Sequence, residues 1–306
     1  MIYLPRKNHG TRRRTTIWRA ALRWPGTKGR NIALTFTDEK GNATSDWFGV
    51  VRYQWYHEPD GSVIEERLDK DGKIVPLRGD FQFMRTRMTF DGQGYFGRLQ
   101  NIDESGELVN TASGAAVFQY DFDTQGRFNR WEVYDKDGLR AIGPSGTAGE
   151  QNTFYKYDLE NIIFFDQQLN PAMHWSGAGR WHFEIDEFGN NILLEFQNGQ
   201  GKPMNTNNGF SRYVAEWTEN GRHLLAEAYF DQEGHKTTHK ISGVHRIEYT
   251  RDYLGLITEK RYLDIDLKLV NRKDNGVAFE KMDYDLNHKP IKTNSFNTKG
   301  KPVQNP

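Results

Sequence analysis

The sequence contains no cysteine in its 306 residues. This absence excludes disulfides, thiolate catalysis and cysteine-ligated zinc, and it is compatible with either redox compartment. The sequence also lacks any apolar run close to the roughly 18 residues that a membrane-spanning helix needs, and its N-terminus has no apolar run typical of a signal peptide. We therefore expect a soluble chain, which would lie at a surface or be secreted if it is part of a longer exported protein.

Apolar residues are scarce for a large globular core. They make up 36% of the chain, and the mean hydropathy is -0.83. Aromatic residues nevertheless reach 13% and there are 30 glycines, which argues against the aromatic-poor composition of a disordered chain. The composition favours many small aromatic clusters separated by turns.

The net charge is zero, but the charges are unevenly distributed. Nine of the 41 Lys and Arg residues lie in residues 1–30, which contain no Asp or Glu, so 32 bases remain against 41 acids in the rest of the chain. We treat residues 1–16 as a basic N-terminal segment, whose Arg12, Arg13 and Arg14 could contact nucleic acid, an anionic surface or the acidic remainder of the chain. The stretch "RRRTTIWRAALRW" (12–24) could form a cationic helix or a strand, and the strand agrees better with the repeat described next.

A short phrase recurs along the chain, as in "FTDEKGN" at 36, "YDKDGLR" at 134 and "FDQEGHK" at 230. Each copy has Asp followed by Gly three positions later, and the residue before the Asp is usually apolar. This spacing is typical of a type I turn, in which the Asp side chain caps the backbone and the Gly adopts positive φ. We assign a structural turn role to Asp38, Gly41, Asp69, Gly72, Asp103, Gly106, Asp135, Gly138, Asp231 and Gly234.

A second series of Asp-x-x-Gly turns lies between these phrases, for example Asp91 to Gly94 and Asp123 to Gly126. Two members keep the Asp and lose the Gly, namely Asp158 to Asn161 and Asp285 to His288. Together the series predict about nine units of about 32 residues, each a β-hairpin that must bury its aromatic face against its neighbours. The predicted fold is all-β, an elongated or spiralled hairpin array over residues 17–306.

The repeat pattern is interrupted in the middle of the chain, around residues 142–182. "IGPSGTAGEQN" (142–152) has the composition of a small-residue insertion, and the unit after it lacks Gly at both expected turn positions, 161 and 170. The pattern indicates either a loop or bend, or drift in a dispensable unit.

The tyrosine-aspartate phrases "FQYDFDTQGRF" at 118 and "YKYDLEN" at 155 resemble the YD repeats of bacterial RHS-type proteins, and the glycine-ended hairpins are similar in style to MORN-like repeats. The resemblance implies a β-hairpin array, bacterial and related to the cell surface. The units are longer than YD repeats, and no aspartyl-protease or toxin segment of the RHS kind is present. The resemblance therefore transfers no activity.

No catalytic signature occurs in a suitable context, and we predict no enzyme activity, cofactor or metal site. The "DKDG" phrases at 69 and 135 lack the six to eight oxygen ligands of a calcium site. The leading hypothesis is a non-enzymatic binding or scaffolding array that recognises a glycan or protein through exposed rings, and the alternative is a piece of an RHS-like toxin-delivery shell. Because regular units use their rings for packing, we place ligand recognition in the irregular unit, at Trp175, Gly177, Gly179 and Trp181.

Overall fold

The computed structural model describes residues 19–23, 32–77 and 81–303. In these residues the chain forms strands and turns without any helix, and so has no helix that could cross a membrane. Contacts divide the chain into two compact units. We call residues 14–153 with 162–175 the N-terminal unit, and residues 154–161 with 176–306 the C-terminal unit, and each is described by itself.

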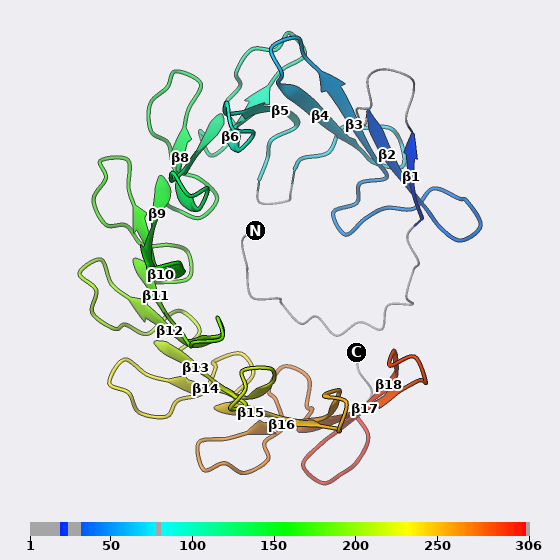
Figure 1. Ribbon diagram of the computed structural model, residues 1–306, viewed down its shortest axis with the longest axis vertical. Helices are drawn as coiled ribbons and strands as arrows, with labels where there is room; N and C mark the ends of the chain where they lie inside the picture. Colours follow the sequence, from blue (N-terminus) through cyan, green and yellow to red (C-terminus); the bar gives the residue numbers. More distant parts are fainter. Residues whose placement is uncertain (1–18, 24–31, 78–80, 304–306) are drawn as a thin grey trace. The chain divides into compact units, whose positions relative to one another are not determined.

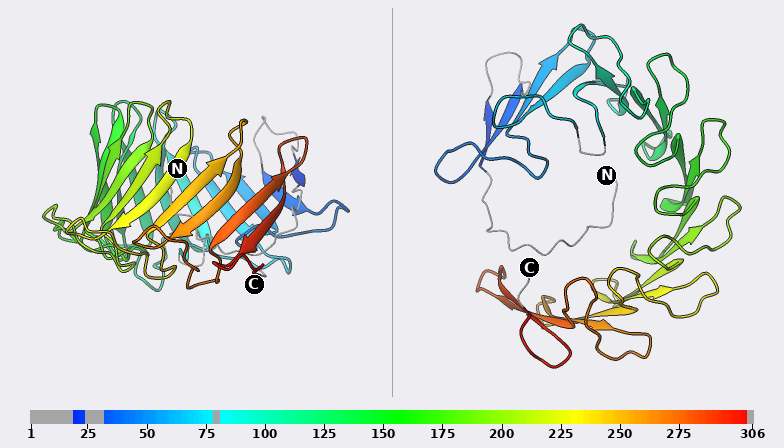
Figure 2. Two further views of the ribbon diagram at one scale, coloured as in Figure 1. Left: turned by 90° about the horizontal axis from the view of Figure 1, so that it is seen from below. Right: turned by 180° about the vertical axis from the view of Figure 1, so that it is seen from behind.

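Eighteen strands in the described residues make nine consecutive antiparallel hairpins, which confirms the predicted hairpin array. Figure 1 shows the hairpins with their labels, and the left view of Figure 2 shows the strands of the C-terminal unit side by side. The N-terminal unit contains β1 (Arg19–Arg23), β2 (Ala33–Thr37), β3 (Arg52–His57), β4 (Val63–Leu68), β5 (Arg85–Phe90), β6 (Phe96–Ile102), β7 (Val117–Phe122) and β8 (Phe128–Tyr134). The C-terminal unit contains β11 (Arg180–Ile185), β12 (Asn191–Gln197), β13 (Arg212–Trp217), β14 (Leu224–Phe230), β15 (Arg246–Arg251), β16 (Ile257–Leu263), β17 (Phe279–Tyr284) and β18 (Pro290–Phe296). The hairpin of β9 (Gly149–Tyr155) and β10 (Asp158–Phe165) contributes residues to both units.

The basic N-terminal segment, residues 1–16 with Arg12, Arg13 and Arg14, lies outside the described residues. Of the stretch 12–24 only residues 19–23 are described, and they form strand β1, which pairs with β2 from Arg19 opposite Thr37 to Arg23 opposite Ala33. The helix interpretation is therefore wrong for these five residues, and residues 12–18 lie outside the described part.

The turn at the end of each second hairpin strand is built by an Asp or, at Asn198 and Asn297, by an Asn. In the turns that begin at Asp38, Asp69, Asp103, Asp135 and Asp231, the Oδ1 atom accepts the backbone N–H groups two and four residues later, at 2.7–3.0 Å. The glycines of these turns have φ between +75° and +88°. A single antiparallel bridge, such as Tyr134 with Arg140, then starts the return of the chain along its own strand.

In the described residues, seven repeats contain a third turn that the Asp-x-x-Gly spacing did not predict. After the return, the chain turns once more at a glycine with positive φ, as at Gly114, where the N–H bonds to the carbonyl of Thr111 at 2.9 Å. Third turns of neighbouring repeats are joined by backbone hydrogen bonds, for example Lys240 N–H to Asn208 O and Lys273 N–H to Ser242 O, both 2.8 Å. The third turns are therefore part of the contact between repeats.

The irregular unit differs from its sequence interpretation in two ways. Residues 142–152 are no insertion, because they contain the third turn of their repeat, closed by the N–H of Gly146 to the carbonyl of Gly143, and the start of β9. The hairpin turn is not Asp158 to Asn161 but the pair Lys156–Tyr157, with Lys156 at φ +54°, so Asn161 lies inside β10. The following turn runs from Asp166 to Leu169, one residue earlier than expected.

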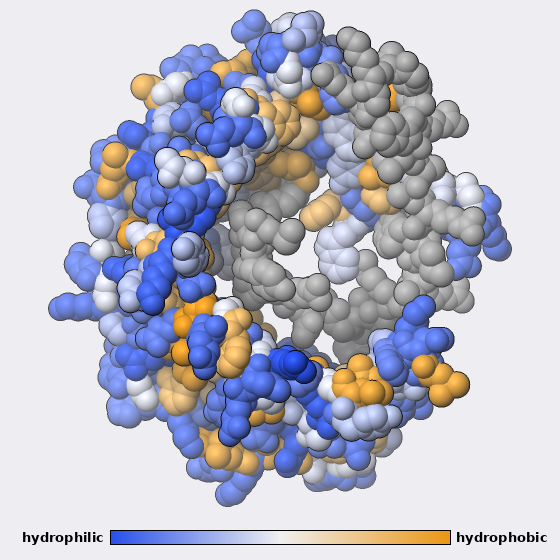
Figure 3. Space-filling view, in the orientation of Figure 1, coloured by the Kyte–Doolittle hydropathy of each residue, from blue (hydrophilic) through white to orange (hydrophobic). Residues whose placement is uncertain are grey.

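Aromatic residues pack in small clusters along the hairpins, as the composition predicted. In the N-terminal unit Trp131 stacks on Phe118 with ring centroids 5.3 Å apart, and both side chains are buried. Gly149 is required beside this pair, because a Cβ there would approach the Trp131 carbonyl to 2.3 Å and the Phe165 ring to 2.4 Å. The face of the molecule in Figure 3 is mostly hydrophilic, with small separate apolar areas.

Candidate functional site

The most distinctive polar group in the N-terminal unit is Arg67, which lies two residues before the turn Asp69. Its side chain is fully buried. The equivalent position holds Val133, Phe164, Phe196 and Tyr229 in other repeats. The other polar residues at this position are Asn101 and Ser295. A buried cation at a position that is apolar or aromatic in most repeats requires a complete set of hydrogen-bond acceptors.

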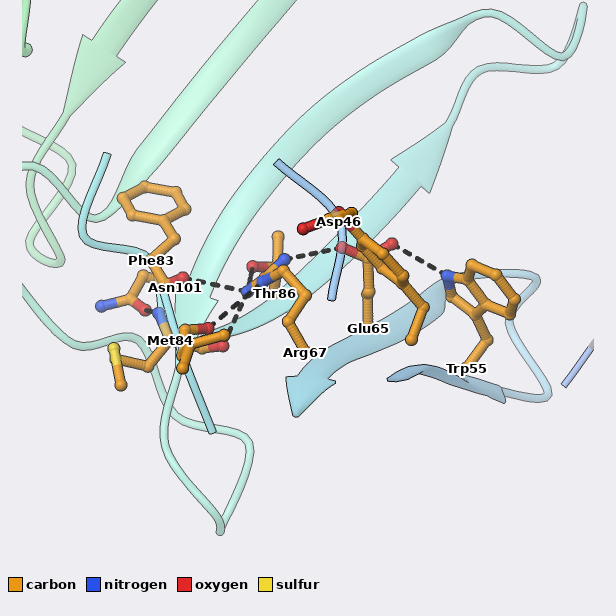
Figure 4. Close-up of polar contacts among 10 residues, drawn as sticks. Asp46, Trp55, Glu65, Arg67, Phe83, Met84, Thr86 and Asn101 are labelled. Atoms are coloured by element: carbon orange, nitrogen blue, oxygen red, sulfur yellow. Dashed lines mark hydrogen bonds and ion pairs between the residues drawn. The ribbon is translucent and has the colours of Figure 1, made fainter. Parts of the chain in front are cut away.

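Arg67 obtains these acceptors from three successive segments (Figure 4). Nη1 bonds to Glu65 at 2.6 Å, and Nη2 reaches the carbonyls of Phe83 at 2.9 Å and Met84 at 2.6 Å and the hydroxyl of Thr86 at 2.8 Å. Burial lowers the pKa of Arg67, and the Glu65 carboxylate opposes that shift. Arg67 therefore links β4 to the segment that precedes β5.

Asn101 occupies the same repeat position in the next hairpin and holds the same segment from the other side. Its Oδ1 accepts the N–H of Met84 at 3.0 Å, and its Nδ2 donates to the carbonyl of Val109 at 2.8 Å. Two buried polar side chains thus fix residues 83–84 (Figure 4). This arrangement determines where the Phe83 ring lies.

A hollow of about 180 Å³ opens beside Phe83, at the third turns of the N-terminal unit. Its floor consists of the buried rings of Phe81, Phe83 and Phe118, whose centroids are 4.3 to 5.6 Å apart. Its rim includes Thr111, Ser113 and Pro144, and the two hydroxyl oxygens are 2.9 Å apart. The hollow therefore combines apolar surface with hydroxyl groups, which suits an apolar side chain or the apolar face of a sugar ring. None of its lining residues has an ionisable side chain.

Trp175, one of the predicted site residues, lies in the next third turn along the chain after the one that contains the rim residue Pro144. Its N–H bonds to the carbonyl of Ser145 at 3.0 Å, and Ser145 follows the rim residue Pro144. The Trp175 side chain is 60% exposed, and its ring is 5.0 Å from that of His174. His174 is buried, and burial lowers its pKa to about 4. Above about pH 4 the His174 imidazole is therefore neutral, and it lies next to the exposed indole of Trp175.

The other three predicted site residues belong to the C-terminal unit, where each contacts other residues of that unit. The Trp181 ring is half-buried and contacts Phe196 edge-to-face at 5.9 Å. Gly179 is buried and its N–H donates to the carbonyl of Gln197 at 2.9 Å. Gly177 is the third-turn glycine, with φ of +87°, and a Cβ there would come within 3.0 Å of Asn207 Oδ1. Gly177 therefore lies in the same third turn as Trp175, whereas Gly179 and Trp181 belong to the start of the next hairpin.

No family model matches this chain. No curated protein matches it. Among solved structures, that of TcdB2-TccC3 aligns with 93% of this chain at 10% identity and a TM-score of 0.34. The Tc holotoxin pore of Photorhabdus luminescens aligns with 90% of this chain at 10% identity and a TM-score of 0.36. This chain spans 18% and 17% of the length of those two chains.

Proposed function

We propose that this protein is a non-enzymatic repeat scaffold that binds a protein segment or a glycan at the hollow of its N-terminal unit. The observation that supports this proposal is the set of three phenylalanine rings beneath a hydroxyl rim. The repeats use most of their rings for packing, whereas this group also lines an opening of about 180 Å³. The exposed indole of Trp175 supplies a second contact along the same edge.

The experiment is a binding screen of peptide and glycan arrays with the purified chain and two variants that block the edge. Ser113→Trp places a bulky side chain on the rim, and Trp175→Ala removes the exposed ring. The matched controls are Ser105→Trp, at an exposed serine in a different turn, and Tyr253→Ala, at a ring that is 94% exposed in the C-terminal unit. Each variant is checked for folding by circular dichroism.

Loss of a ligand in Ser113→Trp with retention in Ser105→Trp would support binding at the hollow. Loss of ligand binding in Trp175→Ala, with binding retained in Tyr253→Ala, would indicate that the binding site includes the third turn that carries Trp175. A ligand that binds all four variants as it binds the parent would contradict the proposal. We expect weak binding at a single site, because ring stacking contributes only about 1 kcal/mol per ring.

The second candidate is a piece of an RHS-like delivery shell, in which repeats enclose or carry an effector. The tyrosine-aspartate phrases at 118 and 155 favour it. Genomic context tests it, because a reading frame that continues into a toxin domain would support the shell.

A further inference from the structure

The turn from Asp231 to His235 in the C-terminal unit carries an unusual set of side chains. Asp231, Glu233 and His235 each offer one ligand atom, and these atoms lie within 4.8 Å of one another. The Asp231 Oδ2 to His235 Nδ1 distance is 3.4 Å. We propose that this turn binds a divalent transition-metal ion of the zinc class through the two carboxylates and the imidazole.

The backbone of the turn holds the donor side chains in position. Asp231 Oδ1 accepts the N–H groups of Glu233 at 3.0 Å and His235 at 2.7 Å, which leaves Oδ2 directed at the imidazole. Residues at positions one, three and five of this tight turn therefore converge on one point. A preorganised set of donors lowers the conformational entropy lost on binding.

Neighbouring residues support the same geometry. Gln232 exchanges hydrogen bonds with Asn205, its N–H donating to Asn205 Oδ1 at 3.0 Å and its Oε1 accepting the Asn205 N–H at 3.3 Å. The Gln232 amide also donates to Glu233 Oε1 at 2.8 Å and so orients that carboxylate. The ammonium of Lys236, the residue after His235, bonds to the carbonyl of Ile265 at 3.3 Å.

The donor types select the class of ion. An imidazole nitrogen with two carboxylate oxygens suits zinc and its first-row neighbours, whereas calcium and magnesium prefer all-oxygen sites. Three protein donors leave coordination positions for water or for a group from a partner. Turns with the same Asp cap lack this set: the Asp69 turn has Asp71 and Lys73, and the Asp135 turn has Asp137 and Leu139.

The test is calorimetric titration of the full chain, without a histidine tag, with zinc chloride, together with cobalt(II) absorption as a probe of coordination. The variants are His235→Ala and Glu233→Gln, which keep the Asp231 cap intact, and the control is His57→Ala, at an exposed histidine of the N-terminal unit. We expect His235→Ala to weaken zinc binding at least about tenfold, equivalent to about 1.4 kcal/mol, and to abolish the cobalt spectrum.

Glu233→Gln should weaken binding in the same direction, and His57→Ala should bind as the parent does. The proposal is overturned if the parent binds no zinc, or if His235→Ala retains the parent affinity and stoichiometry. Both measurements are independent of ligand binding at the hollow, so this proposal and the proposed function fail separately.

Discussion

Replacement of Arg67 by Met tests whether a buried cation holds the floor of the hollow. Arg67 donates to Glu65, to Thr86 and to the carbonyls of Phe83 and Met84, with a longer contact of 3.4 Å to the carbonyl of Val75. Methionine has a similar length and fills the space, but it donates no hydrogen bond. The variant therefore leaves a carboxylate and several carbonyls without their donor.

The magnitude follows from the environment of the pair. The Arg67 side chain is 0% exposed and that of Glu65 is 14% exposed, so solvent compensates little for the lost contacts. Removal of one partner from a buried ion pair costs about 3 to 5 kcal/mol. Glu65 keeps a hydrogen bond from Trp55 Nε1 at 2.8 Å, so we expect the lower end, about 3 kcal/mol.

Urea unfolding measures the change in the free energy of unfolding, and hydrogen exchange locates it. Protection should fall in β4, in residues 81–84 and in β5, and less in distant repeats. Lys70→Met is the control, because the Lys70 side chain is 80% exposed, and it should leave stability unchanged. The double variant Glu65→Met with Arg67→Met should lose less than the sum of the two single variants, because no carboxylate is left unpaired.

Two results would refute this reasoning. One is an Arg67→Met variant whose free energy of unfolding lies within about 1 kcal/mol of the parent. The other is an equal loss of protection throughout the C-terminal unit.

Three further variants test other parts of the structure. Gly138→Val should lower the free energy of unfolding by roughly 1 to 3 kcal/mol, because Gly138 has φ of +82° and strain at this φ, not a clash, is the expected effect. Hydrogen exchange should locate the loss of protection in that turn, and an equal loss in all repeats would contradict the prediction. Gly149→Ala should destabilise more than Gly138→Ala in urea unfolding, because its Cβ would clash with the Trp131 carbonyl at 2.3 Å; an equal or smaller loss would refute the close-packing argument. Burial raises the pKa of Glu150 from 4.5 to about 7, and the Trp131 side chain partly opposes this. The folded state therefore holds a proton that the unfolded chain has released, and stability should fall by roughly 2 to 3 kcal/mol between about pH 5 and pH 8. Glu150→Gln should remove this part of the pH dependence, and an unchanged pH profile of urea unfolding would contradict the assignment.

The hairpins could be predicted from the sequence because their turns depend on local chemistry. Asp caps the backbone within four residues and Gly tolerates positive φ, so both turns leave a short phrase in the sequence. The third turn has no shared capping residue: its first position is Thr111 in one repeat, Gly143 in the next and Arg272 in another. A weaker signal does exist, because each of these glycines directly precedes a buried residue. The pairs are Gly49–Val50, Gly114–Ala115, Gly146–Thr147, Gly177–Ala178, Gly209–Phe210, Gly243–Val244 and Gly276–Val277.

The hollow could not be located from the sequence, because its walls come from three segments that meet only when the repeats stack. Phe81 and Phe83 precede one hairpin, Thr111 and Ser113 precede the next, and Pro144 belongs to the repeat after that. Trp175 was identified by its place in an irregular unit, although the turn that carries it is a regular third turn. The signal for the hollow was Arg67, a cation where the repeat register expects an apolar side chain.

The exceptions at Arg67 and Asn101 explain how a regular array can produce one distinct site. An apolar side chain at this position joins the hydrophobic cluster between repeats, as Val133 does, and needs no hydrogen-bond partner. A buried polar side chain must instead find acceptors or donors, and Arg67 and Asn101 find them in the segments that precede the hairpins, at Phe83, Met84 and Val109. Arg67 and Asn101 bond to opposite sides of residues 83–84 and so determine the path of that segment. The position of the Phe83 ring is therefore fixed by two residues that do not line the hollow.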